Sequence, residues 1–456
     1  MNMNLKLLLP GLLCATMLVG CTGVRQESER AARRDQQAVA DVYRPTNQPP
    51  TLPHLSTNSG LGDFLRYAML NQPKVEAAYY DWAASVERIT TARSLPDPRL
   101  TFEMDISDAL MSLMPGLMVE FPGPGKLKPR AAVASAESSA KYFAFETAAF
   151  QSAFDVKKAY YQLHFLQEKI RVNQQTLTLN ADLERLALAQ NAAGKVTLQD
   201  VLRAQIEQER LTTEIANLED SQDPLLAQLK AALGLTAFQP NPPLPGQFES
   251  TPLDVTSDRL FATALQRNPR LRAMGAEVRM ADAAITLARK GRVPDFNVGL
   301  EVDVKASPVI WTPQAGMTLP IWRDKIAAEI AAAQAGKRSA EARLSAEQIG
   351  LAVDFAAKLF MFRESSRNLA LLQDRLLPKQ RQSLEVARAG YVAGQIDFFN
   401  LIDAEQTLLR FAVAEVEART QRELALAELS LVIMGVPPAG APVLLQQAPS
   451  PPDTKK

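Results

Sequence analysis

The chain has very little cysteine and histidine. Its 456 residues include two Cys and two His, and Cys14 lies in an apolar N-terminal segment that we expect to be removed. Cys21 is then the one cysteine left, so neither a disulfide nor thiol chemistry within the chain is expected. His54 and His164 are far apart in the sequence. The pattern therefore gives no reason to expect a histidine metal site.

An excess of basic charge is also absent. Lys plus Arg and Asp plus Glu each number 50, whereas a nucleic-acid-binding protein usually has a basic surplus. The sequence shows no Ser-His-Asp set, metal cluster, Gly-rich phosphate loop or plausible buried carboxylate pair, so we expect neither an enzyme nor a cofactor. Aromatic residues make up 6%, while Ala, Leu, Gln, Glu and Arg dominate residues 130–235 and 325–435. That composition is typical of long helices.

The first 20 residues have the pattern of a signal peptide. Lys6 precedes an apolar run, residues 7–20, which is too short to span a bilayer as a stable helix. The run ends in Leu18-Val19-Gly20-Cys21, which resembles a bacterial lipobox. That resemblance implies a covalent lipid on Cys21, and Thr22 behind it favours the outer membrane. An ordinary signal peptide followed by a chance cysteine is the alternative.

The rest of the chain is an internal duplication. Asn71-Gln72-Pro73 matches Arg267-Asn268-Pro269, Leu95-Pro96-Asp97 matches Val293-Pro294-Asp295, and Ala193-Gly194-Lys195 matches Ala393-Gly394-Gln395. The order and spacing of the motifs are the same in both halves. The expected organisation is a signal peptide (1–20), a lipidated extended tail (21–59), a first repeat (60–238), a Pro-rich connector (239–256), a second repeat (257–437) and a Pro-rich tail (438–456).

Each repeat is predicted to contain a Pro-broken helical run, two strands and a long helical hairpin. The runs that precede the strands are 61–94 and 260–290, and Pro73 and Pro269 break them. A hairpin turn is expected near 193–197 and near 393–397. The helices that reach these turns, 130–191 and 328–389, are about 60 residues or about 90 Å long, which indicates a coiled coil or a helical barrel.

The predicted strands alternate apolar and polar residues over 99–107, 114–122, 295–304 and 310–319. This is a weak signature of outer-membrane barrel strands, and a half-buried sheet in a soluble protein is the alternative. Lipid tolerates no open sheet edge, so in a membrane several chains would share one barrel. Two chains would supply eight strands, whose interior is filled by side chains, and three would supply 12, wide enough for water. Inward carboxylates favour the wider barrel. The polar positions carry five acids that we expect to face the lumen and to favour cations: Glu103, Asp105, Glu120, Glu301 and Asp303.

In the order of these motifs the chain resembles TolC-like outer-membrane efflux proteins. The resemblance covers residues 60–437 and includes Phe121-Pro122-Gly123-Pro124-Gly125-Lys126-Leu127 after the second strand. It implies a mainly α fold with a small β part: a homotrimer with a 12-stranded barrel among outer-membrane lipids and a long α-helical barrel in the periplasm. It also implies two partners, a periplasmic adaptor protein and an inner-membrane resistance-nodulation-division pump. No nucleic-acid partner is expected.

The resemblance places the two Gly turns at the periplasmic tip, where the adaptor would bind and the channel would close. The expected adaptor-contacting residues are Gly194, Lys195, Val196, Gly394, Gln395 and Ile396. Carried over by position, Asp200, Tyr391 and Asp403 match the family's constriction residues. Asn400 and Ile396 depart from the pattern, which puts the usual Arg lock in doubt. We therefore hypothesise a gate in which Arg203 and Asp403 alternate around a trimer and pair across neighbouring hairpins, and Asp200 bonds Tyr391; a merely solvated Arg203 is the alternative.

The expected substrates are cations, either heavy metals or cationic drugs. The Leu-Pro-Asp-Pro and Pro-Gly-Lys-Leu motifs look similar to those of members that are paired with heavy-metal pumps. Met111, Met114 and Met118 are expected to face lipid or to lie in a loop, with contact to a soft metal as the alternative. A passive periplasm-spanning lipoprotein without a pore is the alternative function.

Overall fold

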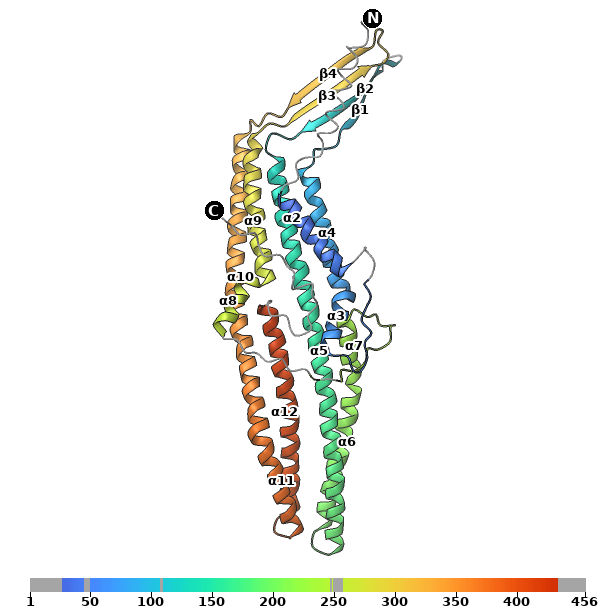
Figure 1. The fold of residues 1–456 in the computed structure, drawn as a ribbon, viewed down its shortest axis with the longest axis vertical. Coiled ribbons are helices and arrows are strands. Elements are labelled where there is room, and N and C mark those ends of the chain that lie inside the picture. Colours follow the sequence, from blue (N-terminus) through green and yellow to red (C-terminus); the bar gives the residue numbers. More distant parts are fainter. Residues whose placement is uncertain (1–26, 45–49, 107–109, 247, 249–256, 434–456) are drawn as a thin grey trace. The chain divides into compact units, whose positions relative to one another are not determined.

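The structure is a computed structural model that describes residues 27–44, 50–106, 110–246, 248 and 257–433 (Figure 1). These residues form two compact units, and each unit takes residues from both repeats. Unit 1 contains the described residues of 1–47, 78–145 and 269–347, and unit 2 contains the others. The compact units therefore do not coincide with the two repeats. Among the described helices, none is both long and apolar enough to cross a bilayer.

Unit 1 contains a four-stranded antiparallel sheet in the order β1-β2-β3-β4. Its strands are β1 (Arg99–Ile106), β2 (Leu110–Phe121), β3 (Phe296–Asp303) and β4 (Ile310–Met317). The register pairs Leu100 with Leu117 and Leu117 with Leu300. Because side chains alternate between the two faces of a sheet, this register gathers most of the apolar residues of the four strands on one face. Most of that face is exposed, including Phe102 at 63% and Trp311 at 63%.

Unit 1 also contains a helix where the sequence predicted an extended tail. Helix α2 (Glu27–Tyr43) is formed by residues that favour helix, since the prolines of the tail begin only at Pro45. The Glu29 carboxylate of α2 is fully buried and accepts hydrogen bonds from Arg93 Nε at 2.6 Å and Thr90 Oγ1 at 2.9 Å. The prediction of an extended tail is therefore wrong for residues 27–43. The helix is held by a buried ion pair with α4 (Pro73–Arg93).

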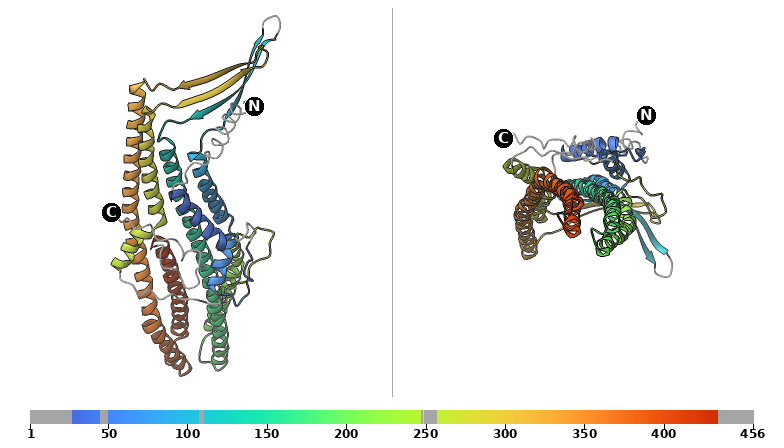
Figure 2. Two further views of the ribbon diagram at one scale, coloured as in Figure 1. Left: turned by 45° about the horizontal axis from the view of Figure 1, so that its top comes forward. Right: turned by 90° about the horizontal axis from the view of Figure 1, so that it is seen from below.

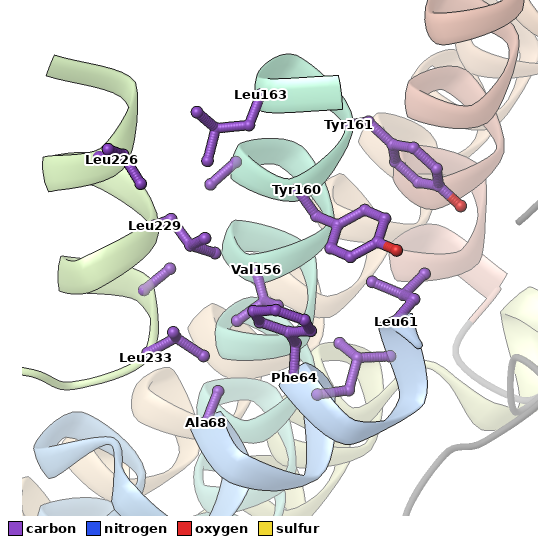
Figure 3. Close-up of a cluster of buried hydrophobic side chains, with 13 residues drawn as sticks. Leu61, Phe64, Ala68, Val156, Tyr160, Tyr161, Leu163, Leu226, Leu229 and Leu233 are labelled. Atoms are coloured by element: carbon purple, nitrogen blue, oxygen red, sulfur yellow. The ribbon is translucent and has the colours of Figure 1, made fainter. Parts of the chain in front are cut away.

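Unit 2 has its main core between three helices of the first repeat (Figure 3). These are α3 (Leu61–Asn71), α5 (Leu127–Ala192), which begins in unit 1, and α7 (Gln222–Ala232). Phe64 of α3, Tyr160 of α5 and Leu229 of α7 are fully buried here, and the Phe64 and Tyr160 rings meet edge to face at 5.5 Å.

The repeated Gln-Pro and Asn-Pro motifs bind the ends of the returning helices. Gln72 Nε2 donates to the Ala232 carbonyl at 3.0 Å, and its counterpart Asn268 Nδ2 donates to the Val432 carbonyl at 3.0 Å. Both amides thereby satisfy carbonyls that a helix end leaves open. In the first repeat, Gly234 has φ +74°, and a Cβ there would lie 2.7 Å from the Asn71 carbonyl oxygen. The motifs repeat because each repeat closes its last helix in the same way.

The helices of the hairpins are less continuous than the sequence predicted. In the first repeat, α6 (Leu198–Asp220) ends before α7, and Pro224 lies in the first turn of α7. In the second repeat, a π turn (Leu372–Leu376) separates α10 (Arg323–Leu371) from α11 (Leu377–Val392), and Pro378 follows this turn. Proline lacks the N–H that a continuous α-helix needs. The other helices of the second repeat are α8 (Ser257–Arg267), α9 (Pro269–Arg289) and α12 (Phe398–Ile433).

Candidate functional site: the two hairpin tips

The two hairpin tips use the same backbone turn. Gly194 and Gly394 have φ of +68° and +71°, the left-handed region that glycine adopts at little cost. Behind them, Lys195 N–H donates to the Gln190 carbonyl at 3.0 Å, and Gln395 N–H donates to the Gly390 carbonyl at 2.8 Å. These are the hydrogen bonds of a Schellman motif, which closes a helix C-terminus.

The residues predicted to contact an adaptor divide into outward and inward groups. Gly194, Lys195, Gly394 and Gln395 are exposed at the ends of the hairpins. Val196 and Ile396 are partly buried and pack against a buried cluster behind the turns. The exposed turn itself therefore consists, in each tip, of a glycine and one polar residue. The Gly-Lys or Gly-Gln pair is followed by one aliphatic residue, Val196 or Ile396, that packs against the buried cluster.

The two hairpins of unit 2 are α5 with α6 and α11 with α12 (Figures 1 and 2). A buried cluster behind their turns, here called the tip cluster, contains side chains of both hairpins. It contains residues of α5, α6, α11 and α12: Leu183, Ala187, Val201, Ala204, Leu384, Tyr391, Phe398, Leu401, Ile402 and Ala404. The rings of Tyr391 and Phe398 lie 5.3 Å apart. Most members are aliphatic or aromatic, so burial of apolar surface holds the tips together.

Tyr391 is a member of this cluster and makes no hydrogen bond to Asp200. Its side chain is 3% exposed, and its hydroxyl has no hydrogen-bond partner. Burial, together with the nearby Asp200 charge, raises the pKa of Tyr391 to about 12. The expected Asp200–Tyr391 hydrogen bond is therefore absent in this chain. The physical reason is that the Tyr391 ring packs against Phe398, and the hydroxyl is buried with it.

Arg203 and Asp403 are both exposed on the returning helices of their hairpins. The Arg203 guanidinium lies over the Phe399 ring, 5.7 Å from its centroid. Among the described residues, neither Arg203 nor Asp403 forms an ion pair. Both charges are thus available to a neighbouring molecule. The proposed pairing between chains stays a prediction.

A pair of buried carboxylates lies beside the tip cluster, so the expectation of no buried carboxylate pair is wrong. Glu207 of α6 is 7% exposed and Glu405 of α12 is 1% exposed. The charge of Glu207, added to burial, raises the pKa of Glu405 to about 8. The signal in the sequence was the spacing of Glu405, four residues after Leu401 and three before Leu408, which places it on the apolar stripe of its helix.

The acids predicted to face a lumen share one face of the sheet, opposite the apolar face. The register and the alternation of side chains place Glu103, Glu120, Glu301 and Asp303 there. Glu301 is 8% exposed and accepts a hydrogen bond from Gln314 Nε2 at 2.6 Å. The backbone of Asp105 follows the same alternation, and its side chain lies outside the described residues.

Two of the three methionines lie on the acidic face, against expectation. Met114 pairs with Glu103 across β1 and β2, and Met118 pairs with Arg99. Both therefore lie on the face opposite Leu117, and not on the apolar one. The side chain of Met111 falls outside the described residues.

The remaining predictions about sites concern the lipid anchor and metals. Cys21 and the signal peptide lie outside the described residues. Within the described part of the chain, no group of three or more His, Cys, Asp or Glu side chains is arranged to hold a metal ion.

Several solved structures share this fold. CusC superposes with a TM-score of 0.70 over 85% of this chain and 98% of its own, at 16% identity. The outer-membrane channel CmeC of Campylobacter jejuni superposes with a TM-score of 0.70 over 86% of this chain and 91% of its own, at 14% identity. The open-state MtrE outer-membrane channel of Neisseria gonorrhoeae superposes with a TM-score of 0.70 over 85% of this chain and 98% of its own, at 16% identity. At these identities the likeness establishes the fold alone.

The sequence comparison establishes the family. A profile of the outer membrane efflux proteins matches residues 65–235 and 260–434, one match in each repeat. The chain therefore belongs to the outer membrane efflux protein family. The cobalt-zinc-cadmium resistance protein CzcC of Cupriavidus metallidurans is 23% identical over 257 residues, which is 56% of this chain and 61% of CzcC. The match thus spans less than two thirds of that relative.

Proposed function

We propose that this protein is the outer-membrane channel of a tripartite efflux system, a passive homotrimeric conduit that an adaptor and an inner-membrane resistance-nodulation-division pump supply with substrate. The observation that carries the proposal is the duplicated hairpin pair, whose two tips have the same exposed Gly turn. Three chains would bring six such turns into one ring for an adaptor to bind. The family and the fold of its relatives support this assignment.

The sheet supports the membrane part of the proposal. Its four strands expose an apolar face and leave β1 and β4 as open edges. An open edge is costly in lipid, because its backbone groups have no hydrogen-bond partners. Three copies joined edge to edge would remove the edges and form a 12-stranded barrel with the acids inside. Such a lumen should prefer cations, so the reversal potential in a salt gradient should have the sign for cations, and anion preference would contradict it.

The lipid on Cys21 belongs to the same proposal. It would anchor the mature N-terminus in the outer membrane a few residues before α2, which Glu29 and Arg93 hold against α4. Mass spectrometry of the mature N-terminal peptide tests this directly. The expected result is a peptide that begins at Cys21 and carries acyl chains, and an unmodified Cys21 would remove the anchor.

For the gate, we keep the pairing of Arg203 with Asp403 of the neighbouring chain. Both side chains are exposed, they occupy equivalent places nine residues after their tip glycines, and they have opposite charge. Exposed ion pairs contribute only about 0–1 kcal/mol each, so contact with an adaptor could open such a ring. Arg203→Ala should raise single-channel conductance. The exchange Arg203→Asp with Asp403→Arg should restore the closed level, and wild-type conductance of Arg203→Ala would end the hypothesis.

For the substrate, we propose heavy-metal cations before cationic drugs. The name of the relative CzcC, cobalt-zinc-cadmium resistance protein, and the acids beside Met114 and Met118 support this order. The test is a deletion strain of the source organism, grown on cobalt, zinc, cadmium, copper, silver and a set of cationic drugs. Greater sensitivity to metals, reversed by the intact gene, is expected. If the deletion strain is more sensitive to drugs alone, cationic drugs replace metals as the proposed substrates. Unchanged sensitivity to every compound would favour a periplasmic spacer without a pore.

A further inference from the structure

Glu405 is a buried acid without a partner. Its side chain is 1% exposed, and neither carboxyl oxygen has a hydrogen-bond partner. It lies on α12 next to Ala404, which belongs to the tip cluster. A buried carboxylate without a partner is among the least favourable groups in a protein, unless it takes up a proton.

The neighbouring acid, Glu207 of α6, has partners. Its oxygens accept hydrogen bonds from Arg210 Nε at 3.0 and 3.1 Å and from Gln406 Nε2 at 3.2 Å. The bond from Gln406 links α12 to α6 at the residue next to Glu405. This contact, here called the α6–α12 joint, connects the two hairpins of one chain. It therefore contains one carboxylate with partners and one without.

The other charges around Glu405 are already engaged or lie at the edge. A cavity of about 350 Å³ separates α5, α11 and α12 beside it. Two ion pairs line this cavity, Arg171–Glu168 on α5 at 2.5 Å and Arg419–Glu415 on α12. Arg381 of α11 also lines the cavity but is exposed. Arg210 and Arg381 are thus the nearby cations, and neither forms a hydrogen bond with the Glu405 oxygens.

We propose that Glu405 is a proton-binding site that closes the α6–α12 joint: a protonated carboxyl holds the two hairpins together, and loss of its proton lets them separate. This inference rests on the proposed function, because it assigns a regulator to the proposed channel tip. The geometry gives the reason. In the closed joint the Glu405 side chain is 1% exposed and lies within the electrostatic influence of Glu207, whereas separation of the hairpins would expose it to water.

The sign of the pH effect follows from the raised pKa. Burial first, and then the charge of Glu207, raise the pKa of Glu405 from 4.5 to about 8, while Arg210 opposes the shift. Between these two values the closed joint holds a proton that an open, hydrated joint would release. Each rise of one pH unit in this range should therefore favour the open joint by about tenfold. The stabilisation of the closed joint by the Glu405 proton is fully present below the ordinary pKa of 4.5. It is lost as the pH rises through the pKa of about 8 that Glu405 has in the closed joint.

The test uses the purified full-length protein at pH values from 5.5 to 9, with two measurements. One is conductance in planar bilayers, and the other is hydrogen exchange of peptides that cover residues 198–210 and 398–410, expressed as protection factors. In the wild type, conductance should rise and protection should fall with pH, and both should level off above pH 8. Glu405→Gln should stay closed and protected across the range.

A matched control and a second variant complete the design. Glu417 lies on the same helix but is exposed, so Glu417→Gln should behave as the wild type. Glu207→Gln removes the charge that raises the pKa of Glu405, so its pH-dependent transition should level off at a lower pH and be smaller in total than that of the wild type. This variant tests the proposal even if Glu405→Gln fails to fold.

The two measurements separate this inference from the proposed function. Absence of conductance in every variant would contradict the channel, while hydrogen exchange would still report on the joint. A wild type with flat protection factors, or a Glu405→Gln variant with the wild-type pH dependence, would overturn the role of Glu405. An unshifted transition in Glu207→Gln would overturn its coupling to Glu207.

Discussion

The two hairpin tips share a backbone and differ in what they bury. In the first tip, Leu198 begins α6 and is 60% exposed; in the second, its counterpart Phe398 begins α12 and is 1% exposed. The same contrast holds for Leu202, at 48% exposure, and Ile402, at 9%. The duplication thus preserved the turn and changed the surface. The first tip presents apolar side chains outward, while the second contributes its own to the tip cluster.

Truncation of the counterparts Leu198 and Phe398 should give the largest difference between the two tips. Phe398→Ala removes a fully buried ring and should lower the free energy of opening of the second tip by about 3–5 kcal/mol. Leu198→Ala removes an exposed side chain and should change that of the first tip by no more than about 0.5 kcal/mol. Hydrogen exchange of the tip amides measures both. Equal effects would mean that the tips are packed alike.

A smaller effect is expected at the repeated Pro-Asp motif before the strands. Asp295 accepts hydrogen bonds from Gly123 N–H at 2.6 Å and Lys126 Nζ at 2.7 Å, whereas its counterpart Asp97 is exposed. Because hydrogen bonds to charged groups contribute about 1.5–3 kcal/mol, Asp295→Ala should destabilise the segment after β2 by about 2 kcal/mol. Asp97→Ala is the matched control. Exchange in peptides that span residues 121–130 should speed up only in the first variant.

The smallest effect should be the same in both tips. Gly194→Ala and Gly394→Ala each force a side chain into the left-handed region, at a cost of about 1 kcal/mol. Space is not the reason, since nothing lies within 4 Å of a Cβ added at either position. Gly336 within α10 has the same open space without a positive φ, so Gly336→Ala should stabilise its helix. Thermal unfolding compares the three variants, and a stabilising Gly194→Ala would contradict the turn geometry.

Local chemistry made much of the fold predictable. Pro73 and Pro269 begin α4 and α9, and Gly194 and Gly394 end α5 and α11 through positive φ. Each of these signals depends on only a few neighbouring residues, so it can be recognised in the sequence. Their recurrence in both halves predicted the duplication. Helix α2 was missed for a related reason: the prolines after residue 44 dominated the interpretation of the whole tail, although the residues before them favour helix.

The side-chain pairings of the candidate site could not be predicted in the same way. Glu207 and Glu405 are 198 residues apart in the sequence, and only the packing of α6 against α12 brings their charges together. Tyr391 was expected to bond Asp200 because of its position relative to Gly394, but the adjacent Phe398 ring determines where it packs. A spacing predicts which face a residue occupies, whereas the partner on that face depends on another helix.

The most direct measurement is the single-channel current of the purified full-length protein in a planar bilayer under a salt gradient. If the protein is a trimeric conduit, the current should show stepwise openings with a cation-selective reversal potential. Arg203→Ala should give larger or more frequent openings. A bilayer that stays silent with the wild type and with Arg203→Ala would contradict the channel and favour a periplasmic spacer.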